Sequence, residues 1–482
     1  MAGGTVQAQS NIRYYIHSAI ALCIMIFARF IPVQYPFTQD GMLVLGVLLG
    51  AIYGFVNGNL YWASTAALLI IGMSDVTTVG AIFVSLMSNG TFMFLIVLFL
   101  LVGHLGHVGF ARVLALKLVQ SKITKGRPWV LTFFLLIAAF LPATVMSVTA
   151  VLVISLPILY GICDEVGIKK TDKWAVLTAI GIGMSCSLAL GFWPFQVGPA
   201  ALFGQLSAAG YEGGVPFVQY ALFMAVMVTF CIPALVLVIK ALKPDVSKLY
   251  NYTPPEEKIK FNSDQKFAGF LVCLLLALFI IPQFLPEGSA IEVFFSQFGS
   301  FAIVSFLLAL GAFIRKNGKP RIDIAQAATS GLVLWPMVIM IGTVLTIAGL
   351  LTRPDLGFND LVTLQLGPIF ESTNIFIFTL AALIFALILT IFVNGPVIYA
   401  IMIPVMVPIA LAMGFPVMQV IAPFVLVSNI GIVLPSGHPL GAVLHGHESV
   451  GSKMVLKYVP IFMLVFFIIA IIVGIPLGIL LF

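Results

Sequence analysis

The stretch TIFVNGPVIYAIMIPVMVPIALAMGF, from Thr390 to Phe415, decides the fold. It is apolar almost throughout, yet Asn394, Gly395 and Pro396 lie inside it. Glycine and proline are poor helix residues, and a lipid-embedded backbone has no water to bind the polar groups that a broken helix frees. Such a break is tolerated where it is buried in protein or lines a cavity. The stretch therefore indicates a membrane protein with an interior site near Asn394.

The composition extends this interpretation to the whole chain. Of 482 residues, 61% are hydrophobic and 8% are charged, and the mean hydropathy is +1.17. A soluble protein carries roughly 25% charged residues. Apolar runs recur from Tyr14 to Phe482, and each is long enough to cross a hydrocarbon core of about 30 Å. We predict an all-α polytopic membrane protein with roughly ten or eleven spanning helices.

The basic residues predict how the chain is oriented. Lys and Arg concentrate in short cytoplasmic loops, and one orientation places all but two of the 23 Lys and Arg residues there. Only Arg29 and Arg353 then lie outside. We expect an integral protein of a bacterial inner (plasma) membrane, with the N-terminus cytoplasmic and the C-terminus outside. Because the basic residues flank spans, the lipid bilayer is the expected partner and nucleic acid is not.

This orientation predicts two re-entrant hairpins. The segment from Pro128 to Cys163 has basic residues at both ends, so it enters and leaves on the cytoplasmic side. Pro142, Ala143 and Thr144 interrupt its middle. A second hairpin, at about 372–413, enters from the outside and folds back at Asn394.

The two hairpins occupy corresponding places in two halves of the chain. A polar linker from Lys243 to Lys266 separates these halves, and in each one a broken hairpin precedes a span that ends in a Gly/Pro-rich stretch. Matching interruptions in opposed halves are typical of inverted-repeat secondary transporters. The predicted divisions are N-terminal scaffold helices (1–88), a first repeat (89–242) with a hairpin at about 128–163, the cytoplasmic linker (243–266), and a second repeat (267–482) with the hairpin at about 372–413 and a C-terminal helix.

The motifs resemble those of the ion transporter superfamily, most closely the divalent anion/sodium symporter family, whose members carry dicarboxylates, citrate or sulfate. That family has Ser-Asn-Thr at both hairpin tips and a Thr-Pro-Pro-Asn-like loop after the next span. Here the corresponding tips are Ser147-Val148-Thr149 and Asn394-Gly395-Pro396, and the corresponding loops are Trp193–Gln196 and His438–Gly441. The resemblance implies a homodimer that moves a small organic anion, a di- or tricarboxylate, with sodium by an elevator mechanism.

Helix N-termini at the hairpin tips carry partial positive charge and attract anions. Hydroxyl and amide groups nearby add hydrogen bonds. The predicted substrate-binding residues are Ser147, Val148 (through its backbone), Thr149, Asn394, Gly395, Pro396, Gln196 and His438.

Oxygen atoms beside the breaks are the predicted sodium ligands, because carbonyls of unwound turns bind Na⁺ in such transporters. The predicted ion-binding residues are Ser147, Ser185, Ser187, Asn394, Ser428 and Asn429. The alternative is that the serines bond within their own helices or allow helices to pack closely.

Three histidines and one glutamate lie close in sequence: His438, His445, His447 and Glu448. Their spacing matches no strong zinc pattern, so we expect no metal, no cofactor beyond sodium as coupling ion, and no enzymatic activity. A membrane-embedded enzyme using this cluster stays as an alternative. His438 alone is a candidate for binding an anion or accepting a proton near neutral pH.

No acidic or basic residue is clearly placed inside a span. Proton antiporters rely on intramembrane carboxylates, so this argues against an antiporter. Two alternatives stay open: a proton-coupled or exchange anion carrier, and a cation/proton antiporter of the same superfamily.

Overall fold

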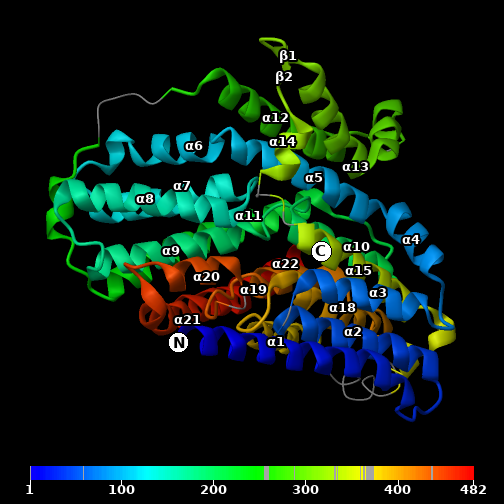
Figure 1. Cartoon of the computed structure of the whole chain (residues 1–482). Coiled ribbons are helices and arrows are strands. Elements are labelled where there is room, and N and C mark those ends of the chain that lie inside the picture. Colours follow the sequence, from blue (N-terminus) through cyan, green and yellow to red (C-terminus); the bar gives the residue numbers. More distant parts are fainter. Residues whose placement is uncertain are drawn as a thin grey trace.

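The computed structural model describes residues 2–482 except 58, 255–259, 287, 331, 332, 334, 359, 362, 363, 365–373, 436 and 437. Two residues of the predicted second hairpin (372 and 373) and five of the predicted linker (255–259) therefore lie outside the described residues. The described part is almost entirely helical, and its only strands form a two-residue pairing, β1 (Arg315–Lys316) with β2 (Lys319–Pro320) (Figure 1).

Helices of the first half run from the N-terminus to the polar linker. Their bounds are α1 (Ala2–Phe27), α2 (Gln39–Asn57), α3 (Leu60–Gly72), α4 (Val79–Ser88), α5 (Gly90–His107), α6 (Phe110–Val119), α7 (Pro128–Ala143), α8 (Val148–Val166), α9 (Lys173–Ala189), α10 (Val197–Ala208) and α11 (Phe217–Ala241). Short 3₁₀ turns lie at Ala28–Phe30, Lys122–Thr124 and Ser247–Asn251.

Helices of the second half follow the linker. Their bounds are α12 (Ser263–Ile280), α13 (Ala290–Phe313), α14 (Ile324–Thr329), α15 (Trp335–Leu351), α17 (Ile375–Leu389), α18 (Gly395–Ala412), α19 (Val417–Ser428), α20 (Pro439–Gly446), α21 (Gly451–Ile469) and α22 (Ile475–Leu481). Further 3₁₀ turns lie at Ile281–Phe284 and Pro354–Leu356, and a π-turn at Ala470–Gly474 joins α21 to α22.

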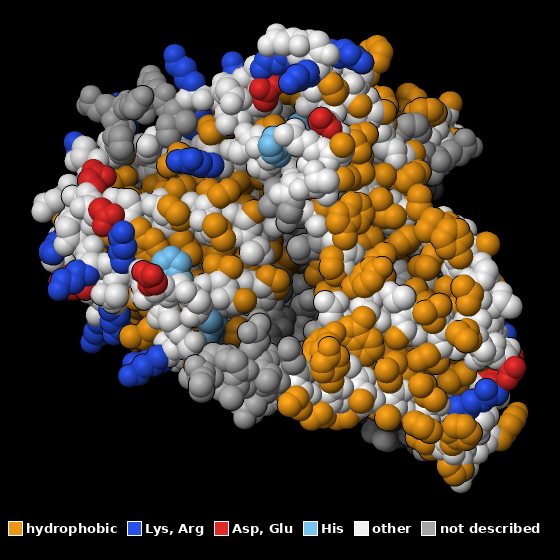
Figure 2. Space-filling view, in the orientation of Figure 1, with side chains coloured by type: hydrophobic (Ala, Val, Ile, Leu, Met, Phe, Trp, Pro, Cys, Tyr) orange, Lys and Arg blue, Asp and Glu red, His pale blue; other side chains and the backbone are white. Residues whose placement is uncertain are grey.

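Length and apolar composition confirm the predicted all-α polytopic membrane fold. Among the described residues, seven helical segments are long and apolar enough to span a bilayer, including α2, α5 and α11, and nine shorter apolar helices accompany them. Hydrophobic side chains gather over the lower right of the surface in Figure 2, over α1 to α3, while most Lys and Arg side chains lie at its top and left. A continuous apolar surface of this kind suits contact with lipid.

The two arginines predicted to lie outside, Arg29 and Arg353, are found together. Arg29 forms an ion pair with Asp75 at 2.7 Å. Arg353 donates to the backbone carbonyl of Val76, the residue that follows Asp75, at 3.1 Å. Two segments more than 300 residues apart in the chain thus bring these arginines to one place.

Each half contains a pair of helices joined by a short non-helical tip, followed by a helix broken in two. In the first half these are α7 with α8, then α9 and α10; in the second they are α17 with α18, then α19 and α20. The halves interlock, since α10 packs on α18 and α20 packs on α8 and α9. This packing brings the breaks of both halves into the interior.

Candidate functional site

The first hairpin tip lies between Ala143, where α7 ends, and Ser147, the N-cap of α8. Pro142 lies in the last turn of α7 and donates no backbone hydrogen bond there, which weakens the end of the helix next to the tip. The Ser147 hydroxyl accepts the backbone N–H of Ala150 at 3.5 Å, at the long limit for such a bond. Its lone pairs and proton therefore keep capacity for another partner.

Gln196 connects this tip to the break between α9 and α10. It is the N-cap residue of α10, and its Nε2 donates to the carbonyls of Ala143 at 3.2 Å and Thr144 at 2.6 Å. Its Oε1 is buried and has no partner among the described residues. A buried amide oxygen without a donor is costly, so Gln196 Oε1 is a candidate acceptor at this break.

A cavity of about 110 Å³, hereafter the tip cavity, lies beside these groups. It brings together five of the predicted substrate-binding residues: Ser147, Val148, Thr149, Gln196 and His438. None of the described residues lining it is charged. Much of the remaining wall is apolar, with Leu98, Phe99, Leu101, Val102 and Leu105 of α5 on one side.

His438 reaches the tip cavity as the N-cap of α20. Its Nδ1 accepts the backbone N–H of Leu440 at 3.1 Å. An accepting Nδ1 carries no proton, so in the neutral ring Nε2 bears the hydrogen and is the donor. His438 is 9% exposed, and a neutral imidazole N–H can bind an anion without placing a full charge in the interior.

The second tip lies elsewhere in the site. Asn394 caps α18 by accepting the Val397 N–H at 3.4 Å, and neither it nor Gly395 or Pro396 is among the described residues lining the tip cavity. Gly395 instead packs on Asn429, so closely that an added Cβ would overlap Asn429 Oδ1. The eight predicted substrate-binding residues therefore form two groups.

A central polar cluster joins the second tip to both breaks. We define it as Ser187, Thr390, Tyr399, Ser428 and Asn429, all of them buried. The Asn429 amide donates to the Tyr399 hydroxyl at 2.7 Å and to the Val425 carbonyl at 2.8 Å. The Ser187 hydroxyl donates to the Asn429 carbonyl at 2.8 Å, which links α9 of one half to the break of the other.

The cluster lies next to the tip cavity. Gly198 lines the cavity, and a Cβ added there would be 4.0 Å from both Asn429 Oδ1 and the Tyr399 hydroxyl. One layer of glycine backbone therefore separates the two groups of predicted residues.

The predicted sodium ligands differ in their bonding. Ser185 is fully buried, and its hydroxyl has no partner among the described residues. Ser187 bonds across the two halves, whereas the Ser428 hydroxyl donates to the Phe424 carbonyl of its own helix at 2.8 Å. The atoms available to coordinate an ion are hydroxyl, amide and carbonyl oxygens. Such neutral oxygens suit Na⁺ at unwound helices.

The remaining histidines point to different partners. His445 contacts the Ser452 hydroxyl at 2.9 Å and the Val433 carbonyl at 2.8 Å. His447 stacks on Tyr160 and contacts its hydroxyl at 3.4 Å. Within the described part of the chain, no group of three His, Cys, Asp or Glu side chains converges on a common point.

Sequence reasoning missed several groups that complete the site. Thr390 donates to the Ser428 carbonyl at 3.0 Å and accepts the Gly431 N–H at 3.1 Å. Tyr220 donates to the Gly191 carbonyl at 2.6 Å. One feature of the sequence could have indicated such groups: a tyrosine within an apolar span, such as Tyr399, needs a hydrogen-bond partner for its hydroxyl.

A membrane helical fold with paired hairpins and broken helices around an interior site is typical of membrane transporters. The model of the citrate transporter family CitMHS matches residues 41–318. Because this match covers more than half of the chain, the protein belongs to that family and is a transport protein, as the motifs predicted. The match agrees with the symporter resemblance and favours transport over enzymatic activity.

Two solved structures share the fold. The YdaH transporter of Alcanivorax borkumensis, described as having an unusual topology, is 15% identical with a TM-score of 0.59 and covers 98% of both chains. MtrF of Neisseria gonorrhoeae, described within a class of antimetabolite efflux pumps, is 13% identical with a TM-score of 0.60 and covers 93% of this chain and 97% of its own. No curated protein matches the chain by sequence.

Proposed function

We propose that this protein is a secondary active transporter that carries a small organic anion, a di- or tricarboxylate, together with sodium. The observation that carries the proposal is the convergence of three helix N-termini on the tip cavity. Ser147, Gln196 and His438 cap α8, α10 and α20, and all three line this cavity. Each N-terminus contributes partial positive charge and free N–H groups.

The absence of charged side chains from the described lining of the tip cavity suits a site that must release its anion after transport. A fixed Arg or Lys would bind a carboxylate tightly both when the site loads and when it must release the substrate. Dipoles and hydroxyls bind it more weakly and allow release. Coupling to sodium then supplies the missing positive charge. The oxygen atoms of Gln196, Ser185 and Ser187 are the proposed ligands nearest the breaks, with Ser147, Asn394, Ser428 and Asn429 as further members.

The membership in a citrate transporter family supports the substrate class. We extend the proposal, on the symporter resemblance, to a homodimer that moves its site by an elevator motion, with its N-terminus in the cytoplasm of a bacterial cell. Mass photometry in nanodiscs tests the dimer, and labelling of single cysteines from each side of the membrane tests the orientation.

The central experiment is uptake of labelled citrate into proteoliposomes under a sodium or a potassium gradient. We expect uptake only with sodium. The double variant S147A/T149V removes two hydroxyls from the tip cavity and should reduce uptake about tenfold at low citrate, since each hydrogen bond contributes about 0.5–1.5 kcal/mol. Ser207→Ala, an exposed hydroxyl on α10, is the matched control.

Other outcomes separate the alternatives. Uptake that follows a proton gradient without sodium would favour proton coupling, with His438 as the first residue to test. Exchange of internal for external citrate without either gradient would indicate an exchange carrier. Transport of cations against protons, without citrate, would contradict the proposal and favour an antiporter.

The apolar side of the tip cavity favours a second candidate function. Leu98, Phe99 and Phe195 face the same space as the three N-termini, which suits a carboxylate attached to an apolar body. The likeness to MtrF, described within a class of antimetabolite efflux pumps, supports efflux as the direction of transport. Competition of aromatic carboxylates with citrate tests it: stronger inhibition by the aromatic acid than by succinate would favour this candidate.

A further inference from the structure

Another cavity, at the end of α5, combines basic side chains with a buried histidine whose Nε2 has no partner among the described residues. We call it the basic pocket. Its volume is about 530 Å³, and it lies where the end of α5, the start of α12, the β1–β2 hairpin and α14 meet. The residues that matter for its chemistry are His104, His107, Asp264, Lys316, Lys319 and Arg321.

The β1–β2 hairpin gathers the cations. Four basic residues fall within the seven residues from Arg315 to Arg321. The turn between the strands is Asn317-Gly318, and both residues have positive φ, 52° and 78°. Asn-Gly is the preferred sequence for such two-residue hairpin turns. The tight turn places Lys316 and Lys319 directly across from each other.

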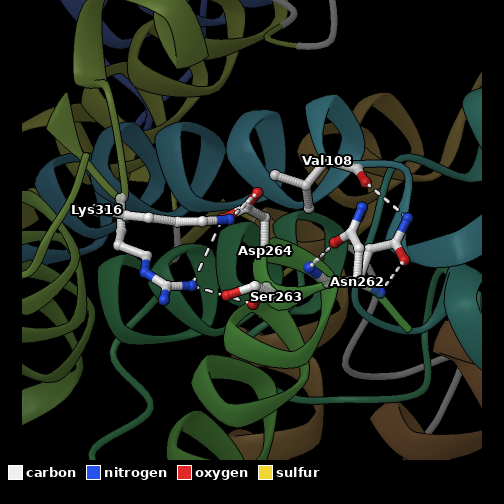
Figure 3. A network of polar contacts seen from close by, with 7 residues as sticks. Val108, Asn262, Ser263, Asp264 and Lys316 are labelled. Atoms are coloured by element: carbon white, nitrogen blue, oxygen red, sulfur yellow. Dashed lines mark hydrogen bonds and ion pairs between the residues drawn. The ribbon is translucent and has the colours of Figure 1, made fainter. Parts of the chain in front are cut away.

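The two carboxylates of the basic pocket are already engaged. Asp264 forms ion pairs with Lys316 at 2.9 Å and Arg321 at 3.5 Å, and Figure 3 shows the Lys316 and Asp264 side chains directed at each other. Asp323 accepts the Gln326 N–H at the start of α14. Lys319 has no ion-pair partner among the described residues, so the pocket keeps an excess of positive charge.

His104 gives an independent indication of a ligand. It is 6% exposed and lines the pocket, yet its Nε2 is buried without a partner among the described residues. Arg321 Nε is a second buried nitrogen without a partner. Buried polar atoms are hydrogen-bonded in almost all native proteins. Both residues line the same basic cavity, and each has one buried nitrogen for which the described residues supply no partner.

We propose that the basic pocket binds a phosphate group. Phosphate offers several strong acceptor oxygens and a negative charge, and arginine and lysine together are its usual partners in proteins. His104 and Arg321 supply inner N–H groups, while Lys319 supplies the uncompensated charge. The group can belong to an anionic phospholipid, since basic pockets between membrane helices bind such head groups, or it can be free phosphate.

The position of the pocket gives binding a structural consequence. Leu105 of α5 lines the tip cavity, whereas the adjacent His104 lines the basic pocket. Gln265 of α12 also donates to the Val108 carbonyl at the end of α5, at 3.3 Å. A phosphate that joins His104 to Arg321 therefore fixes α5 to α12 and the hairpin beside the tip cavity. This inference does not depend on which substrate the tip cavity carries.

The test is thermal unfolding of the full-length protein in nanodiscs. One arm compares phosphatidylcholine with phosphatidylcholine containing phosphatidylglycerol. The other adds inorganic phosphate to pure phosphatidylcholine nanodiscs, against chloride at equal ionic strength. Binding raises the unfolding temperature. A shift with phosphatidylglycerol alone identifies the lipid as the source, and a shift with inorganic phosphate identifies the free anion.

Variants make the test specific. Lys319→Gln should weaken binding about tenfold, the effect of losing one charge-assisted hydrogen bond. Lys319 is exposed and has no ion-pair partner among the described residues, so we expect the variant to fold. His104→Leu should raise the unfolding temperature without ligand and reduce the ligand-induced shift. Lys125→Gln, an exposed cation outside the pocket, is the control. An absent shift, or an equal shift in wild type and Lys319→Gln, would overturn the proposal.

Discussion

The two hairpin tips occupy corresponding places in the two halves, but they face different surroundings. Ser147 of the first tip faces the tip cavity and makes one long hydrogen bond to Ala150. Gly395 of the second tip is buried against Asn429 with no room for a side chain. The same arrangement of helices therefore yields an open tip in one half and a closed tip in the other.

This difference indicates a division of roles. The open tip has unused hydrogen-bonding capacity and suits a ligand that comes and goes. At the closed tip, Gly395 packs directly on Asn429 of the central polar cluster, so this tip suits a structural contact. Variants on the open and the closed side test whether this division is real.

The largest expected effect comes from adding one methyl group to the closed side. A Cβ at Gly431 would overlap the backbone carbonyl of Thr390, whereas a Cβ at Gly198, beside the tip cavity, meets its nearest atom, the Leu190 carbonyl oxygen, at 3.5 Å. Gly431→Ala should cost about 3 kcal/mol or more in free energy of unfolding, and Gly198→Ala well under 1 kcal/mol. Denaturant unfolding in detergent measures both; similar losses would contradict the division.

The second prediction compares the amide groups at the two breaks. Asn429 bonds within the closed cluster, and Gln196 bonds to the carbonyls of the open tip. Asn429→Ala should lower stability by about 2–3 kcal/mol, because it removes two buried bonds and leaves the Tyr399 hydroxyl unpaired. Tyr399→Phe, which removes only the hydroxyl, should cost about 1 kcal/mol.

At the open tip the expected effect is on ligand binding. Gln196→Ala should change stability less than Asn429→Ala while raising the KM for the transported anion about tenfold, as expected for a lost ligand contact and a less ordered tip. Initial-rate uptake and unfolding on the same preparations separate the two effects. A stability loss at Gln196 as large as that at Asn429, with KM unchanged, would assign both amides to structure.

Much of this architecture could be predicted from the sequence because membrane physics restricts the options. A lipid-embedded helix satisfies its own backbone hydrogen bonds, so the polar and helix-breaking runs Pro142-Ala143-Thr144 and Asn394-Gly395-Pro396 predicted the breaks. Basic residues at both ends of the first hairpin indicated that its chain returns to the same side. These patterns are local in sequence, so they can be recognised without knowledge of tertiary contacts.

The division of the predicted substrate-binding residues into two groups could not be predicted in the same way. Both tips were expected to bind substrate together, since their motifs correspond. Whether a tip faces a cavity or a neighbouring helix depends on long-range packing, such as that of Gly395 on Asn429 and of Gln196 on Thr144. Tyr399 was missed because one hydroxyl hardly changes the apolar pattern of its span.

The smallest expected effect distinguishes the two serines predicted as sodium ligands. Ser428 donates within its own helix to Phe424, whereas Ser187 donates to the Asn429 carbonyl of the other half. Bonds of the first kind slightly destabilise helices, so Ser428→Ala should leave stability within about 0.5 kcal/mol of wild type. Ser187→Ala should cost about 1 kcal/mol.

A sodium titration of anion uptake shows whether either serine also binds the ion. We expect Ser187→Ala to raise the sodium concentration needed for half-maximal uptake and Ser428→Ala to leave it unchanged. The Ser428 hydroxyl proton is committed to Phe424, but its oxygen could still face an ion. A raised sodium requirement in Ser428→Ala would therefore place the ion inside the central polar cluster and make the closed tip part of the transport site.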